Sequence, residues 1–68
     1  MKSVSGKRFA RILLQHGWML VRITSSHHIF AKPGCPARIS VPIHGNADLK
    51  IGLLRSLMKA AGISEDEL

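Results

Sequence analysis

The stretch that decides the fold is residues 18–32, WMLVRITSSHHIFAK. β-Branched and aromatic residues on both sides of Ser25 and Ser26 are typical of two strands joined by a tight turn. If the two serines form a two-residue loop, three cross-strand pairs follow. These pairs are Thr24 with His27, Ile23 with His28, and Val21 with Phe30.

Alternation along these strands predicts two different faces. One face is mostly apolar and is expected to pack on helices; it carries Met19, Val21, Ile23, His28 and Phe30. The other face is expected to remain open; it carries Leu20, Arg22, Thr24, His27, Ile29 and Ala31. The two adjacent histidines are therefore predicted to point to opposite sides of the sheet, and a one-residue slip in register would exchange them.

A helix is predicted before the hairpin. It begins near Gly6, with Ser3 or Ser5 as its N-cap, and Gly17 ends it. Its buried stripe is predicted to consist of Phe9, Ile12 and Leu13, with His16 as a further candidate, and its solvent face of Lys7, Arg8 and Arg11.

A third strand and a second helix are predicted after the hairpin. Residues 33–36, PGCP, are expected to form a loop, and residues 38–43 a strand with Ile39 and Val41 inward and Arg38 and Ser40 outward. Pro42 marks either the end of this strand or an edge position. The polar connection 44–48 leads into a helix over about residues 47–61, capped by Asn46 or Asp48 and stopped by Gly62. Its buried side is predicted to contain Leu49, Leu53, Leu54, Leu57, Met58 and Ala61, with Lys50, Arg55 and Lys59 outside. Ser64 and Glu67 have the spacing of a capping box.

This order predicts a two-layer α+β domain, α-β-β-β-α, with a three-stranded antiparallel sheet and both helices on one face. The 68 residues are long enough for a single domain, 1–68. No run of residues resembles a signal peptide or a membrane span, and the lone cysteine, Cys35, is expected to be a loop residue in a reducing compartment. A cytoplasmic protein without a membrane partner is the expectation.

The charge of the chain is unevenly distributed. Three of its four acids lie in the last four residues, so ten Lys and Arg side chains are balanced by Asp48 alone up to Ser64. Such a basic domain predicts a polyanionic partner, either nucleic acid or an acidic protein surface.

Several segments together resemble the HicA family of toxins, also known as YcfA-like proteins, with a fold similar to double-stranded-RNA-binding domains. The matching segments are Gly17-Trp18, 20–24 (LVRIT), 26–30 (SHHIF), 39–42 (ISVP) with His44, 49–52 (LKIG) and 61–64 (AGIS). The resemblance implies a ribosome-independent mRNA interferase that a HicB-type antitoxin inhibits. The family motif Gly-Ser-His places its serine on Ser26 and its histidine on His27; Ser25 stands where the family has glycine.

Ribonuclease chemistry suits these residues. RNA supplies its own nucleophile, the 2′-OH, and histidine transfers protons near neutral pH. His27 is the predicted catalytic acid or base, and Ser26, His28 and His44 are further candidates for catalysis or RNA contact. The candidates for phosphate binding are Arg22, Lys32, Arg38 and Lys50. No Cys/His grouping has zinc spacing, and apart from residues 65–67 near the end of the sequence there is no cluster of acids, so neither a metal nor a cofactor is expected.

Two alternatives remain open at this stage. The domain could bind RNA through phosphates without cutting it, although the start of its last helix offers Lys50 rather than a cluster of basic residues. It could also be a degenerate toxin, retained as the binding partner of an antitoxin and impaired by Ser25. The toxin alone is expected to be a monomer.

Overall fold

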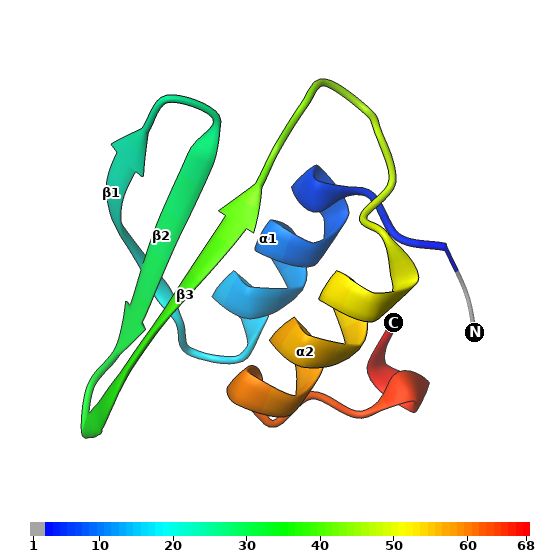
Figure 1. Cartoon of the computed structure of the whole chain (residues 1–68). Helices are drawn as coiled ribbons and strands as arrows, with labels where there is room; N and C mark the ends of the chain where they lie inside the picture. The colour runs from blue at the N-terminus through cyan, green and yellow to red at the C-terminus, as the bar shows by residue number, and fades with distance from the viewer. Residues whose placement is uncertain (1–2) are drawn as a thin grey trace.

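The computed structural model describes residues 3–68 and confirms the order α-β-β-β-α (Figure 1). The elements are α1 (Gly6–Gln15), β1 (Met19–Thr24), β2 (His27–Lys32), β3 (Cys35–Pro42) and α2 (Ile51–Ala61), followed by a short 3₁₀ turn, η1 (Glu65–Glu67). The strands form one antiparallel sheet in the order β1-β2-β3, and both helices lie on the same side of it. The expected two-layer architecture is therefore correct.

Three of the four ends of α1 and α2 follow the predicted local chemistry. The Ser5 hydroxyl caps α1 by accepting a hydrogen bond of 3.1 Å from the Arg8 N–H. Gly17 follows α1 with a φ of 89°, and Gly62 ends α2 with a φ of 71°, both in the region that glycine adopts without steric cost. α2 departs from the prediction at its start: it begins at Ile51 after Lys50, and neither Asn46 nor Asp48 caps it.

The core lies between the helices and the β2–β3 half of the sheet. Its largest fully buried side chains are Phe9, Leu13, Phe30, Ile39, Val41 and Leu54, joined by Val4. Leu53, expected in the core, is 38% exposed, because the register of α2 turns it away from the sheet. His16, the further candidate for the buried stripe, is half-buried at the end of α1.

Two strand predictions are wrong. Met19, Val21 and Ile23 are each more than half exposed, because β1 is an edge strand that extends past the helices. A β-bulge at Val21 also shifts the register, so that Leu20, not Val21, pairs with Phe30. Leu20 therefore lies on the helix side and Met19 on the open side, the reverse of the prediction.

The third strand is longer than predicted. Only Pro33 and Gly34 form the turn after β2, whereas Cys35 and Pro36 belong to β3 and Cys35 pairs with Lys32. Pro36 is tolerated there because β3 is an edge strand.

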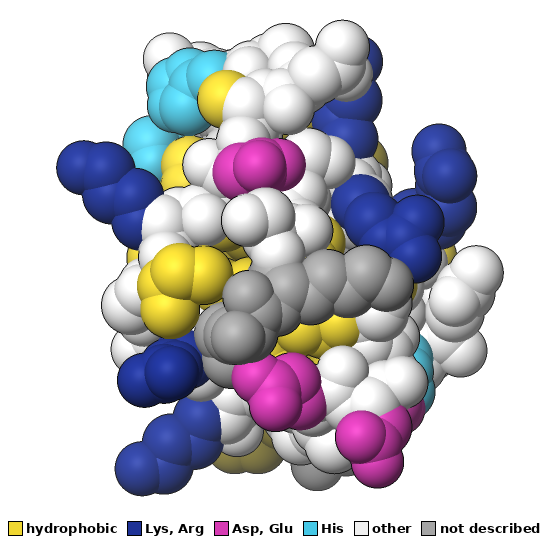
Figure 2. Space-filling view, turned by 90° about the vertical axis from the view of Figure 1, so that its right-hand side faces the viewer, with side chains coloured by type: hydrophobic (Ala, Val, Ile, Leu, Met, Phe, Trp, Pro, Cys, Tyr) yellow, Lys and Arg dark blue, Asp and Glu magenta, His cyan; other side chains and the backbone are white. Residues whose placement is uncertain are grey.

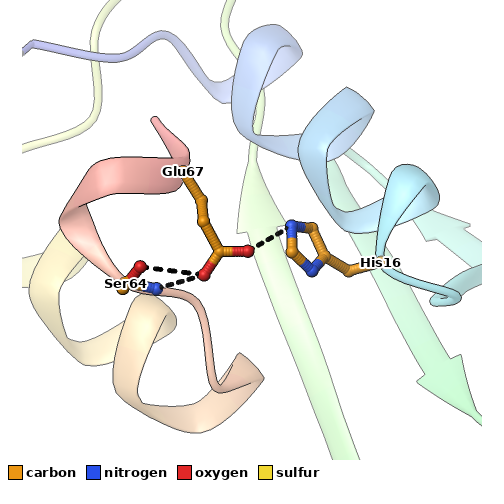
Figure 3. Close-up of polar contacts among 3 residues, drawn as sticks. All are labelled: His16, Ser64 and Glu67. Atoms are coloured by element: carbon orange, nitrogen blue, oxygen red, sulfur yellow. Dashed lines mark hydrogen bonds and ion pairs between the residues drawn. The ribbon is translucent and has the colours of Figure 1, made fainter.

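The C-terminal segment is held against α1 by a polar cluster (Figure 3). Glu67 accepts hydrogen bonds from the Ser64 backbone N–H at 2.8 Å and from its hydroxyl at 2.9 Å, which confirms the capping box. The other carboxylate oxygen of Glu67 lies 2.8 Å from Nε2 of His16. The hydrogen bonds from Ser64, and secondarily the attraction of His16, lower the pKa of Glu67 below its ordinary value of 4.5.

This cluster makes the stability of the domain acid-sensitive. Because the pKa of Glu67 is lower in the folded chain, the unfolded chain binds more protons in acid. The stabilisation is therefore complete above about pH 4.5 and is lost as the pH falls through the folded value. We expect Glu67→Gln to be less stable than the native chain at pH 7 and to approach it at pH 3 in urea unfolding. Glu65→Gln, which removes a charge from the same turn and neither hydrogen bond, should leave the acid-dependent loss in place; equal loss in all three proteins would contradict the assignment.

Candidate functional site

The hairpin turn fixes the start of β2. Ser25 has a φ of 55°, a value that L-residues other than Asn and Asp rarely adopt. The carbonyl of Ser26 accepts a 2.8 Å hydrogen bond from the N–H of Ile43, just beyond the end of β3. The turn is thus anchored to the third strand, and His27 is the first residue after it.

His27 lies on the open face of the sheet, away from the helices. It pairs with Thr24 on β1 and with Pro42 on β3, and its side chain is exposed. The pairing with Thr24 is the one that a two-residue loop predicts. The next row on the same face joins Arg22, Ile29 and Ser40. Diagonal neighbours in a sheet lie about 7–8 Å apart, so the long side chain of Arg22 can reach the space above His27.

The remaining basic candidates lie at different distances from His27. Arg38 is on the same face but pairs with Ala31, four residues along β2, or about 13 Å away. Lys32 is at the far end of β2, where its Nζ lies 5.9 Å from the centre of the Trp18 ring. Lys50 is the N-cap residue of α2 and lies outside the sheet. The structure therefore brings Arg22 close to His27 and separates Lys32 from it.

The two adjacent histidines point in opposite directions. His28 pairs with Ile23 and Val41 and so lies on the helix side, where its Nδ1 is buried and has no hydrogen-bond partner among residues 3–68. Val41 is fully buried. His28 is therefore part of the packed layer, and only His27 is presented on the open face. Ser26 is half-buried in the turn.

A pocket of about 220 Å³ opens beside this end of the sheet. It is lined by Pro42, His44, Ala47, Asp48, Leu49, Lys50 and Leu53. Pro42 is also the sheet partner of His27, so the pocket begins about one strand spacing, 4.8 Å, from the backbone of His27. His44 and Lys50 thus come together in the pocket, on the far side of Pro42 from His27.

Asp48 also lines this pocket, a position that the sequence patterns do not predict. Its position before a helix suggested a cap, yet it lies two residues before the actual N-cap, Lys50. The sequence feature that distinguishes Asp48 is that it is the one acidic residue before Ser64, in a segment whose other charged residues are all basic.

Within residues 3–68, no three His, Cys, Asp or Glu side chains lie close enough together to hold a metal ion. The helices of this part of the chain are all too short or too polar to cross a membrane.

Comparison with known families decides the kind of protein. The model of the family described as the HicA toxin of bacterial toxin–antitoxin systems matches residues 6–63. The chain belongs to the HicA family. No curated protein matches the chain. The matched span of this HicA chain includes both helices, the whole sheet, the hairpin turn and the pocket.

The turn of this HicA chain yields a prediction. A serine at a φ of 55° is strained by about 1–2 kcal/mol relative to glycine, and the greater freedom that glycine gives the unfolded chain offsets about half of this. We therefore expect Ser25→Gly to raise the free energy of unfolding by about 0.5–1 kcal/mol. Urea unfolding with an unchanged m-value would measure this gain. Ser25→Val should lower stability, since a β-branched residue resists this φ more strongly; stabilisation by valine would show that the turn is not strained.

Proposed function

We propose that this HicA chain is a metal-independent endoribonuclease that cuts mRNA without the ribosome, with His27 as its catalytic histidine. The observation that carries the proposal is the exposed imidazole of His27 on the open sheet face, with Arg22 in the adjacent row. Family membership supports it, because toxins act on an essential component of the cell and a basic surface suits a polyanion.

The proposed reaction uses the ribose 2′-OH as nucleophile. A base takes the proton of the 2′-OH, the O2′–P bond forms, and the P–O5′ bond breaks as an acid protonates O5′. The products are a 2′,3′-cyclic phosphate and a 5′-OH. His27 serves as base or acid, and His44, on the other side of Pro42, is the candidate for the opposite role. The guanidinium of Arg22 would stabilise the charge that develops on the phosphorane oxygens.

The test compares substrates that differ in one group. The purified chain should cleave single-stranded RNA in the presence of EDTA and should not cleave the same sequence with 2′-O-methyl groups. The RNA products should carry cyclic phosphate and 5′-OH ends. Equal binding of both substrates without cleavage of either would instead support the non-catalytic RNA-binding module.

We further propose that the partner is a HicB-type antitoxin that covers the His27 face in the cytoplasm, and that the toxin alone is a monomer. Membership of a toxin–antitoxin family implies an antitoxin partner. The positive charge of the chain favours an acidic surface on that partner. Expression of the chain should arrest growth, and co-expression of the antitoxin encoded beside it should restore growth. Continued growth without any antitoxin would favour a degenerate toxin.

A further inference from the structure

The pocket beside His27 combines features that fit a single RNA base. Its wall is apolar, with Pro42, Ala47, Leu49 and Leu53, and its polar groups are His44, Asp48 and Lys50. Its volume of about 220 Å³ is below the range of about 300–1,000 Å³ typical of larger ligands, so it suits one flat ring system. Leu53 leaves 38% of its surface exposed there, which provides an apolar surface for a base to cover.

Asp48 is the acidic group of this pocket, and it is exposed. Among residues 3–68 its carboxylate makes neither a hydrogen bond nor a salt bridge, although Lys50 lines the same pocket. On a surface that binds RNA phosphates, an acid weakens the attraction. Figure 2 shows acidic and basic side chains at different places on one face: Lys and Arg lie along both margins, and Asp and Glu lie toward the middle and the lower edge. An unpaired acid in a base-sized pocket is therefore suited to read a base rather than a phosphate.

The donor pattern of the bases selects the ligand. A carboxylate only accepts hydrogen bonds, through two oxygens side by side. Guanine presents two adjacent donors, N1–H and the N2 amino group, on its Watson–Crick edge. Cytosine and adenine each present one amino donor next to a ring-nitrogen acceptor, and uracil presents one N–H between two carbonyls, so each would set an acceptor against the second carboxylate oxygen.

We propose that this pocket binds a guanine base of the RNA, with Asp48 accepting from N1–H and N2–H and thereby setting the sequence preference of cleavage. The exposed side of Leu53 packs against the ring of the base, and Lys50 provides a positive charge for the adjoining phosphate. Since Pro42 borders both the pocket and His27, the guanine would lie next to the phosphate that is cut. The inference rests on the proposed function for its link to cleavage, but the pocket itself can be tested without cleavage.

The test is an NMR titration of the full chain with GMP, IMP, AMP, CMP and UMP. GMP should shift the backbone amides of Ala47, Asp48 and Leu49 saturably. IMP, which lacks only the 2-amino group of guanine, should bind about tenfold more weakly, and the other three nucleotides weaker still. In Asp48→Asn the GMP affinity should fall at least about tenfold and the difference between GMP and IMP should disappear. The spectrum of the variant also reports whether it is folded.

Several outcomes would overturn the pocket assignment. These are equal binding of all five nucleotides, no binding, unchanged GMP affinity in Asp48→Asn, or the same shifts with inorganic phosphate alone. Cleavage assays on RNAs that differ in one base separate the two proposals. A chain that cuts RNA with no preference for guanine keeps the nuclease and refutes the pocket, whereas one that binds GMP selectively and cuts nothing keeps the pocket and refutes the nuclease.

Discussion

Replacing His27 by alanine is expected to lower the rate of RNA cleavage by about 10²- to 10⁴-fold, the usual contribution of one acid–base group. The imidazole is exposed and lies outside the hydrophobic core, so its removal should leave the packing of the helices on the sheet intact. RNA affinity should change little, because phosphate contacts from basic side chains dominate binding. The effect should therefore appear in kcat and not in KM. Single-turnover cleavage of a labelled RNA measures it.

His16→Ala is the matched control for this experiment. It also removes one histidine, but His16 lies at the end of α1 and contacts Glu67 at the C-terminal segment (Figure 3). This variant should lose a little stability and retain full cleavage. If His27→Ala cuts RNA as fast as the native chain, or if His16→Ala loses activity to the same extent, His27 is not the catalytic group.

The position of His27 could be predicted because its causes are local. A two-residue loop fixes the register of a hairpin, and that register places Thr24 opposite His27 and Ile23 opposite His28, as found. The prediction fails two residues further along, at Val21, because a bulge adds a residue without any marker such as glycine in the sequence. The error does not affect His27, because the bulge lies between the misplaced residues and the turn.

The exposure of β1 and the pocket could not be predicted, because both depend on how elements distant in sequence pack. Alternating apolar residues such as Ile23 look like a core face, but two short helices cover only the β2–β3 half of a three-stranded sheet. The pocket arises where the end of β3 meets the start of α2. Pro42 and Leu53 line it together. The late start of α2 at Ile51 leaves Asp48 outside the helix, in a segment that forms an antiparallel bridge with Ser5.

Gly6 is the position where the smallest substitution should have a large effect on folding. It is buried at the first turn of α1, and its N–H donates to the carbonyl of Ala47 at 3.4 Å. A Cβ atom on Gly6 would overlap the carbonyl oxygen of Pro42 and would lie 3.1 Å from a side-chain carbon of Ile43. Backbone cannot move aside as a flexible side chain does, so α1 or the end of β3 must shift. We expect Gly6→Ala to lower the free energy of unfolding by about 1–3 kcal/mol.

Gly52→Ala gives the matched comparison with the opposite sign. Gly52 lies in α2, where an added Cβ would meet no atom within 4 Å, and alanine favours helix over glycine. Its free energy of unfolding should rise by up to about 1 kcal/mol in the same urea titration. Because the atom that Gly6→Ala displaces belongs to Pro42, the sheet partner of His27, any folded Gly6→Ala protein should also lose cleavage activity. Equal stability of the two alanine variants would show that α1 and β3 do not approach as closely as the fold requires.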